Sequence, residues 1–110
     1  MMNDLATRSC TPRSGPALDR AASEKLLEHL SGWTLDADGK GIHRMFRFQS
    51  YYASMAFVNA AAWIAHREDH HPDMQVAYNT VRIALSTHSV GGLSENDFIC
   101  AAKIDALGTL

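Results

Sequence analysis

The sequence has no excess of positive charge and no long hydrophobic run. Among its 110 residues, 10 Lys and Arg face 12 Asp and Glu, so the formal net charge is −2. Such a chain has no positive field to attract nucleic acid or an anionic membrane surface. No apolar stretch approaches the roughly 18 residues that a membrane-spanning helix needs, and the first residues lack the apolar core of a secretory signal. These absences predict a cytoplasmic protein that binds neither nucleic acid nor membrane.

Cysteine is also scarce. Cys10 and Cys100 are the two cysteines of the chain and lie far apart in sequence, which favours free thiols in a reducing compartment over a disulfide framework. No serine or cysteine occupies a nucleophile motif with a base partner, which argues against covalent catalysis. The hydrophobic fraction of 46% and the charged fraction of 20% are ordinary for a globular protein.

The chain divides into two parts. Residues 1–17 contain Pro12, Gly15 and Pro16 among scattered polar residues and show no hydrophobic period. Such a composition predicts a flexible N-terminal extension. Residues 18–110 are long enough for one domain with its own core.

Apolar periodicity predicts the elements of this domain. Asp19 is a suitable N-cap for a helix that ends near Leu30, and Pro72 prevents a longer helix from continuing because it lacks an amide hydrogen. The predicted elements are helices at 19–30, at 50–68 and from 94 onward, and strands at 33–35, 42–48, 74–78 and 80–87. Their order, a leading helix and then ββαββα, predicts an α+β two-layer domain. It has a four-stranded antiparallel sheet with helices on one face.

Histidine is unevenly distributed. Four of the six histidines lie within residues 66–88, at the predicted end of a helix and the end of a strand; they are His66, His70, His71 and His88. A single histidine is usually a surface residue or a satisfied core group, and a protonated imidazole also suits a helix C-terminus. Four in so short a stretch instead indicate a functional site.

Metal binding and acid–base chemistry are the two alternatives for these histidines. His66 and His70 are four residues apart on one helical face, where Asp69 or Asp97 could complete a metal site. Imidazoles also exchange protons near neutral pH, with a carboxylate to orient one of them. Asp97 either closes a capping box with Ser94 or points inward and approaches His88.

The pattern of these residues resembles the signature of the pterin-4a-carbinolamine dehydratases, over about residues 18 to 107. The matching segments are Asp69-His70-His71-Pro72, Tyr78-Asn79, Leu85-Ser86-Thr87-His88, Gly91-Gly92-Leu93-Ser94 and Asp97. The resemblance implies the same helix and ββαββα arrangement. It also implies a hydro-lyase that removes water from 4a-hydroxytetrahydrobiopterin to give quinonoid dihydrobiopterin. That step recycles the pterin cofactor of aromatic amino acid hydroxylases without a metal or organic cofactor.

The resemblance also implies roles for individual residues. His70, His71 and His88 form the acid–base set, with His71 and His88 closest to the proton transfers and His70 positioning the ring. Asp97 is expected to orient or charge His88.

The remaining implications concern supporting residues and partners. Asp69 is expected to hold a histidine in one tautomer, and Pro72 is expected to be a further supporting residue of the site. His66 stands where family members often have a glutamate, and Met74 stands where many animal members have a tryptophan. A homodimer or homotetramer is implied. The alternative is a binding module of the transcriptional coactivator type on the same fold.

Overall fold

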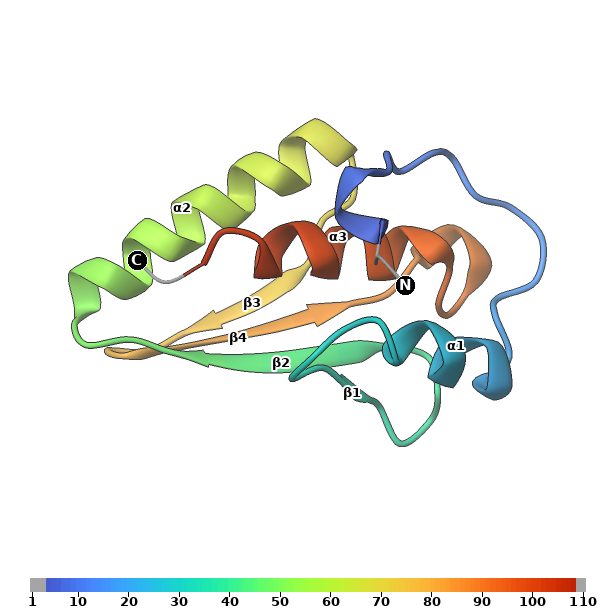
Figure 1. Cartoon of the computed structure of the whole chain (residues 1–110), viewed down its shortest axis with the longest axis horizontal. Helices are drawn as coiled ribbons and strands as arrows, with labels where there is room; N and C mark the ends of the chain where they lie inside the picture. Colours follow the sequence, from blue (N-terminus) through green and yellow to red (C-terminus); the bar gives the residue numbers. More distant parts are fainter. Residues whose placement is uncertain (1–3, 109–110) are drawn as a thin grey trace.

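The computed structural model describes residues 4–108 as an open sheet with helices packed on one face (Figure 1). The elements in chain order are η1 (Leu5–Thr7), α1 (Arg20–Leu27), β1 (Thr34–Leu35), β2 (Ile42–Arg47), α2 (Tyr51–Glu68), β3 (Asp73–Val76), β4 (Thr80–Leu85), η2 (His88–Val90) and α3 (Glu95–Asp105). The four strands are antiparallel in the order β1-β2-β4-β3. The predicted α+β two-layer domain is therefore confirmed. No helix within residues 4–108 has the length and apolarity to cross a membrane.

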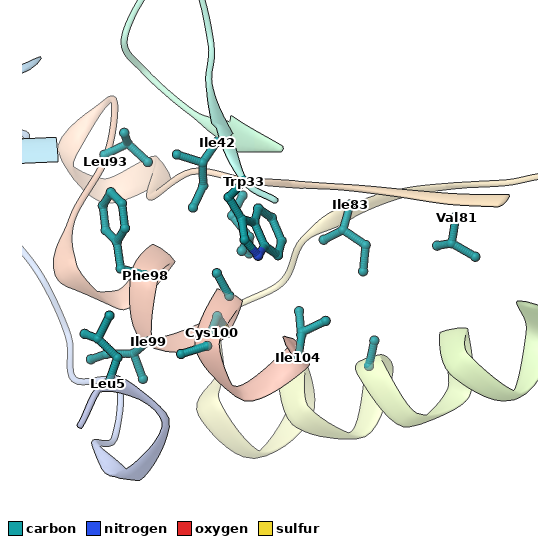
Figure 2. Packing of buried hydrophobic residues seen from close by; sticks show 14 of the residues in the cluster. Leu5, Trp33, Ile42, Val81, Ile83, Leu93, Phe98, Ile99, Cys100 and Ile104 are labelled. Atoms are coloured by element: carbon teal, nitrogen blue, oxygen red, sulfur yellow. The ribbon is translucent and has the colours of Figure 1, made fainter. Parts of the chain in front are cut away.

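Alternation along β4 creates the sheet side of the core. Val81, Ile83 and Leu85 are 0%, 0% and 1% exposed, and the residues between them are half-buried. In β2, Ile42 pairs with Leu85 across the sheet and is fully buried. Figure 2 shows Ile42, Ile83 and Val81 pointing from the sheet toward the helix layer, in which α3 supplies Ile104 to the same cluster. Burial of one face per strand fixes the register, because a slip by one residue would expose this whole set.

Several element ends differ by a few residues from the sequence prediction. The leading helix ends at Leu27 instead of Leu30, although Asp19 caps it as predicted, accepting the amide of Ala22 at 2.8 Å. The strand predicted at 74–78 runs from Asp73 to Val76. The strand predicted at 80–87 ends at Leu85, because Thr87 leaves the ladder and pairs with Gly92. This last difference bends the chain toward the helix layer and shapes the site described below.

The segment ahead of α1 is packed in this structure, whereas the sequence predicts a flexible extension there. Its residues 1–3 lie outside the described part. Leu5 is 3% exposed and lies on the face of α3 that carries Ile99 (Figure 2). Lys103 Nζ donates to the Ala6 carbonyl at 3.0 Å. A segment without periodicity can therefore dock through one apolar residue and a few main-chain hydrogen bonds.

Candidate functional site

A pocket of about 450 Å³ lies where the end of α2, the chain after β4 and the N-terminal segment (residues 4–17) meet. Asp69, His70, His71 and His88 all line it. Four of the seven site residues predicted from sequence are therefore brought together. A volume of this size lies within the roughly 300–1,000 Å³ range of small-molecule sites.

A tight turn at the end of α2 presents the two adjacent histidines. Asp69 adopts a left-handed conformation with φ 51° and ψ 45°. The His70 amide donates to the Ala65 carbonyl at 3.1 Å and the Asp69 amide to His66 at 3.3 Å, the two bonds of a Schellman motif. Glycine usually occupies the left-handed position, and aspartate is among the few residues that tolerate it. The turn reverses the chain so that His70 points back toward the core.

His70, and not His88, is the partner of Asp97. The His70 Nε2 and Asp97 Oδ1 atoms are 2.6 Å apart, and these residues are 8% and 0% exposed. The expectation that Asp97 approaches His88 is therefore wrong. The physical reason lies in the turn at Asp69, which carries His70 inward, whereas His88 follows β4 into an exposed 3-10 turn.

A hydrogen-bond network holds the Asp97 carboxylate. Its Oδ2 atom accepts the Thr87 hydroxyl at 2.8 Å and the Ser94 amide at 3.0 Å. Because the single Thr87 proton goes to the carboxylate, the 2.7 Å contact between Thr87 and Ser94 places the Ser94 hydroxyl as donor. The capping box of Ser94 and Asp97 is present. The buried Asp97 carboxylate thus caps the N-terminus of α3 and also orients the His70 imidazole.

These neighbours change the pKa of His70. Burial of the ring is the largest single influence and lowers the pKa, but the hydrogen bond that the ring donates to Asp97 and the negative charge of that carboxylate raise it. The charges of Cys10 and Asp69 add to the increase, so the pKa of His70 lies above its ordinary value. Because Nε2 faces Asp97, a neutral ring carries its proton on Nε2. The pair thus favours an imidazolium next to the pocket.

The remaining predicted residues differ in position. His71 and His88 are exposed on the pocket wall. Pro72 ends the turn without lining the pocket. His66 is exposed on α2, outside the pocket, and stacks on Trp63 with ring centroids 5.6 Å apart. Within residues 4–108 no three His, Cys, Asp or Glu side chains form a group that could hold a metal ion, so His66 and His70 do not converge as the metal alternative requires.

Sequence reasoning missed a large share of the pocket. The residues without a prediction are Cys10, Thr11, Pro12, Arg13, Glu68, Ser86, Thr87, Ser89 and Asn96. Thr87 could have been predicted from the sequence, because it directly precedes His88 in a segment that resembles the family signature. The residues at 10–13 reach the pocket through long-range docking, which local periodicity does not reveal.

Comparison with solved structures finds the same fold. A crystal structure titled transcriptional coactivator/pterin dehydratase, from Brucella melitensis, matches with a TM-score of 0.79 and 34% identity over 83% of this chain and 97% of that chain. A pterin dehydratase-like protein, titled a RuBisCO assembly factor in the alpha-carboxysome, matches with a TM-score of 0.62 and 26% identity. That match covers 72% of this chain and 93% of the other.

Sequence comparison is more specific. A relative from Nitrosomonas europaea is 58% identical over 107 residues, covering 94% of this chain and 93% of its own length. One from Stenotrophomonas maltophilia is 57% identical over 105 residues, covering 94% and 90%. Both bear the provisional name pterin-4-alpha-carbinolamine dehydratase. The family model for pterin 4 alpha carbinolamine dehydratase matches residues 16–107, and the chain belongs to that family.

Proposed function

We propose that the protein is a hydro-lyase that converts 4a-hydroxytetrahydrobiopterin to quinonoid dihydrobiopterin by histidine acid–base catalysis. The observation that carries the proposal is the pocket in which His70, His71 and His88 lie together, with the buried Asp97 bonded to His70. Family membership supports the same activity.

The proposed reaction needs two proton transfers and no covalent intermediate. An acid protonates the departing 4a-hydroxyl group as the C4a–O bond breaks, and water leaves. A base takes the proton from N5 as the C4a–N5 double bond forms. One proton is given and one is taken, so the enzyme returns to its starting state. Groups that titrate near neutral pH, such as imidazoles, suit both steps.

We assign the proton transfers to His71 and His88 and the positioning of the ring to His70. His71 and His88 are exposed on the pocket wall, where they can exchange protons with substrate and water. His70 is held by Asp97 through Nε2, which leaves Nδ1 available for a hydrogen bond to the pterin. The raised pKa of His70 keeps it charged over a wider pH range, which suits a fixed donor.

The test is a dehydratase assay that follows formation of the quinonoid product from the 4a-carbinolamine. Replacing His71 with Ala should lower the rate by about 10²-fold or more, the usual contribution of a general acid or base. His66→Ala is the matched control, because it removes an imidazole four residues before His70 but outside the pocket. The proposal is refuted if wild-type protein does not exceed the buffer rate, or if the two variants lose equal activity.

A non-catalytic binding role is the second candidate, and the assembly-factor title of one structural relative favours it. Association into a homodimer or homotetramer, in the cytoplasm, is part of our proposal. The exposed aromatic side chains of α2, Tyr52 at 83% and Trp63 at 60%, support such an assembly. Sedimentation would measure the assembly. The binding role would be favoured by a variant that lacks both His71 and His88, still binds every partner and also retains its cellular function.

A further inference from the structure

One wall of the pocket comes from a segment that the family model does not include. The family match begins at residue 16, whereas residues 10–13 line the same pocket as the three histidines. Figure 1 shows the blue N-terminal chain leaving η1 beside the end of α2 and passing the start of α3 before it turns toward α1. The N-terminal segment is therefore part of the site's structure.

Asn96 fixes the segment to α3. Its side-chain Nδ2 donates to the Thr11 carbonyl at 2.7 Å, and its Oδ1 accepts the Thr11 amide at 3.2 Å. A side-chain amide that bonds both groups of one residue replaces the partner that a neighbouring strand would provide. Asn96 is 6% exposed, so these bonds are shielded from water and hold the wall in one place.

Two further main-chain bonds fix the segment on either side of Thr11. The Cys10 amide donates to Glu68 Oε1 at 2.8 Å, and the Ser89 hydroxyl donates to the Arg13 carbonyl at 2.8 Å. The wall is thus tied to α2 and to the chain after β4, which present the histidines, and to α3, which carries Asp97.

Arg13 brings a cation with unused donors to this wall. Its Nε donates to Asn96 Oδ1 at 3.0 Å and its Nη1 to Glu95 Oε1 at 3.4 Å. A guanidinium has five N–H donors, so three are left without a partner among residues 4–108. Glu95 Oε1 is also bound by Arg8 at 3.1 Å, so one carboxylate faces two guanidinium groups and a positive charge is left over. An arginine held in this way is pre-organised to donate to an oxygen acceptor.

We propose that the N-terminal segment completes the substrate site and that Arg13 donates a hydrogen bond to an oxygen atom of the bound pterin. This inference rests on the proposed function. A pterin offers two such oxygen sources, the ring carbonyl and the hydroxyl groups of the C6 side chain. Asn96 acts as the positioning residue, because it holds both the Thr11 main chain and the Arg13 guanidinium.

The experiment compares Arg13→Gln and Arg13→Lys with Arg8→Gln. Arg8 is the matched control, since it binds the same Glu95 atom from the same segment but does not line the pocket. Michaelis constants are measured with the carbinolamines of tetrahydrobiopterin and of 6-methyltetrahydropterin, which lacks the side-chain hydroxyls. Dissociation constants are measured for 7,8-dihydrobiopterin, which has no 4a-hydroxyl to lose. Thermal unfolding of each variant checks that the fold is intact.

Loss of a hydrogen bond from a charged donor should raise KM and Kd about tenfold or more in Arg13→Gln, with kcat changed much less. Arg13→Lys should recover part of the loss, and Arg8→Gln should match wild type. A KM effect on both substrates identifies the ring oxygen as the acceptor, and an effect on the biopterin substrate alone identifies the side chain.

Equal constants for Arg13→Gln and Arg8→Gln would overturn the role of Arg13. Wild-type protein that binds dihydrobiopterin without turning over the carbinolamine would defeat the dehydratase proposal alone, because the binding constants still decide the role of Arg13. Wild-type protein that does not bind the pterin would overturn both.

Discussion

Replacing Asp97 with asparagine separates the two tasks of this carboxylate. The side-chain oxygen of the asparagine would still accept the Ser94 amide and keep the helix cap, but the negative charge facing His70 Nε2 would be gone. A hydrogen bond between charged groups contributes about 1.5–3 kcal/mol. The site is buried, with Asp97 0% and His70 8% exposed. We therefore expect the free energy of unfolding to fall by about that amount when His70 is protonated.

The sign of the pH dependence follows from the direction of the His70 shift. Its pKa is raised in the folded protein, so its contribution to stability is complete below the unfolded pKa of about 6.5. That contribution is lost as the pH rises through the folded pKa. The difference between wild type and Asp97→Asn should therefore be larger at about pH 5.5 than at about pH 9. Each unit by which the pKa is raised corresponds to about 1.4 kcal/mol of this difference.

Two measurements check this prediction. Urea unfolding of both proteins at the two pH values gives the free energies, and NMR titration of the His70 ring gives the pKa directly. The His70 pKa should fall in Asp97→Asn, and the pH-dependent part of the stability difference should match the fall. An equal loss of stability at both pH values, with the His70 titration unchanged, would refute the pairing of these two residues.

Three further predictions concern the turn, the docked segment and the core. Asp69→Ala should unfold about 1 kcal/mol more easily than Asp69→Asn in urea, because asparagine tolerates the left-handed conformation and alanine does not; equal stabilities would contradict the left-handed conformation at this position. Asn96→Ala should speed amide hydrogen exchange at Thr11 by removing its acceptor, while amides of β4 keep wild-type rates; unchanged exchange at Thr11 would show that Asn96 does not hold the segment. Ser23→Ala should leave the protein equally stable or more stable by about 1 kcal/mol in thermal unfolding, because the buried Ser23 hydroxyl has no partner among the described residues; a clear loss of stability would reveal a bond that the structure does not contain.

The sequence predicted the parts of the fold that local rules determine. Alternation at Val81, Ile83 and Leu85 depends on the two-residue period of a strand, and the end of α2 depends on the chemistry of Pro72. The docking of residues 5–13 depends instead on partners far away in sequence, such as Glu68 and Asn96. No local period carries that information, so the extension was predicted to be flexible.

In the functional site, too, local patterns predicted some features, and contacts between distant residues decided the others. The histidines were found because an unusual residue type gathered in one segment. The partner of Asp97 was predicted incorrectly, since the choice between His70 and His88 depends on the left-handed conformation of Asp69. Aspartate at that position is compatible with several backbone conformations, and a pattern of residue types alone does not distinguish them.

Adjacent histidines with different environments follow from this turn, and the difference argues for a division of tasks. His70 directly follows the left-handed residue Asp69, whereas His71 is restricted to extended geometry because it precedes Pro72. His70 is consequently 8% exposed and bonded to a buried carboxylate, whereas His71 is exposed on the pocket wall. A ring fixed and charged by Asp97 is a poor proton carrier, because releasing its proton would leave the carboxylate charge uncompensated. The His71 ring on the pocket wall is open both to substrate and to water. His70 therefore suits holding the substrate, and His71 suits the proton transfers. The pH profile of kcat should accordingly follow the NMR titration of His71 or His88 and not that of His70.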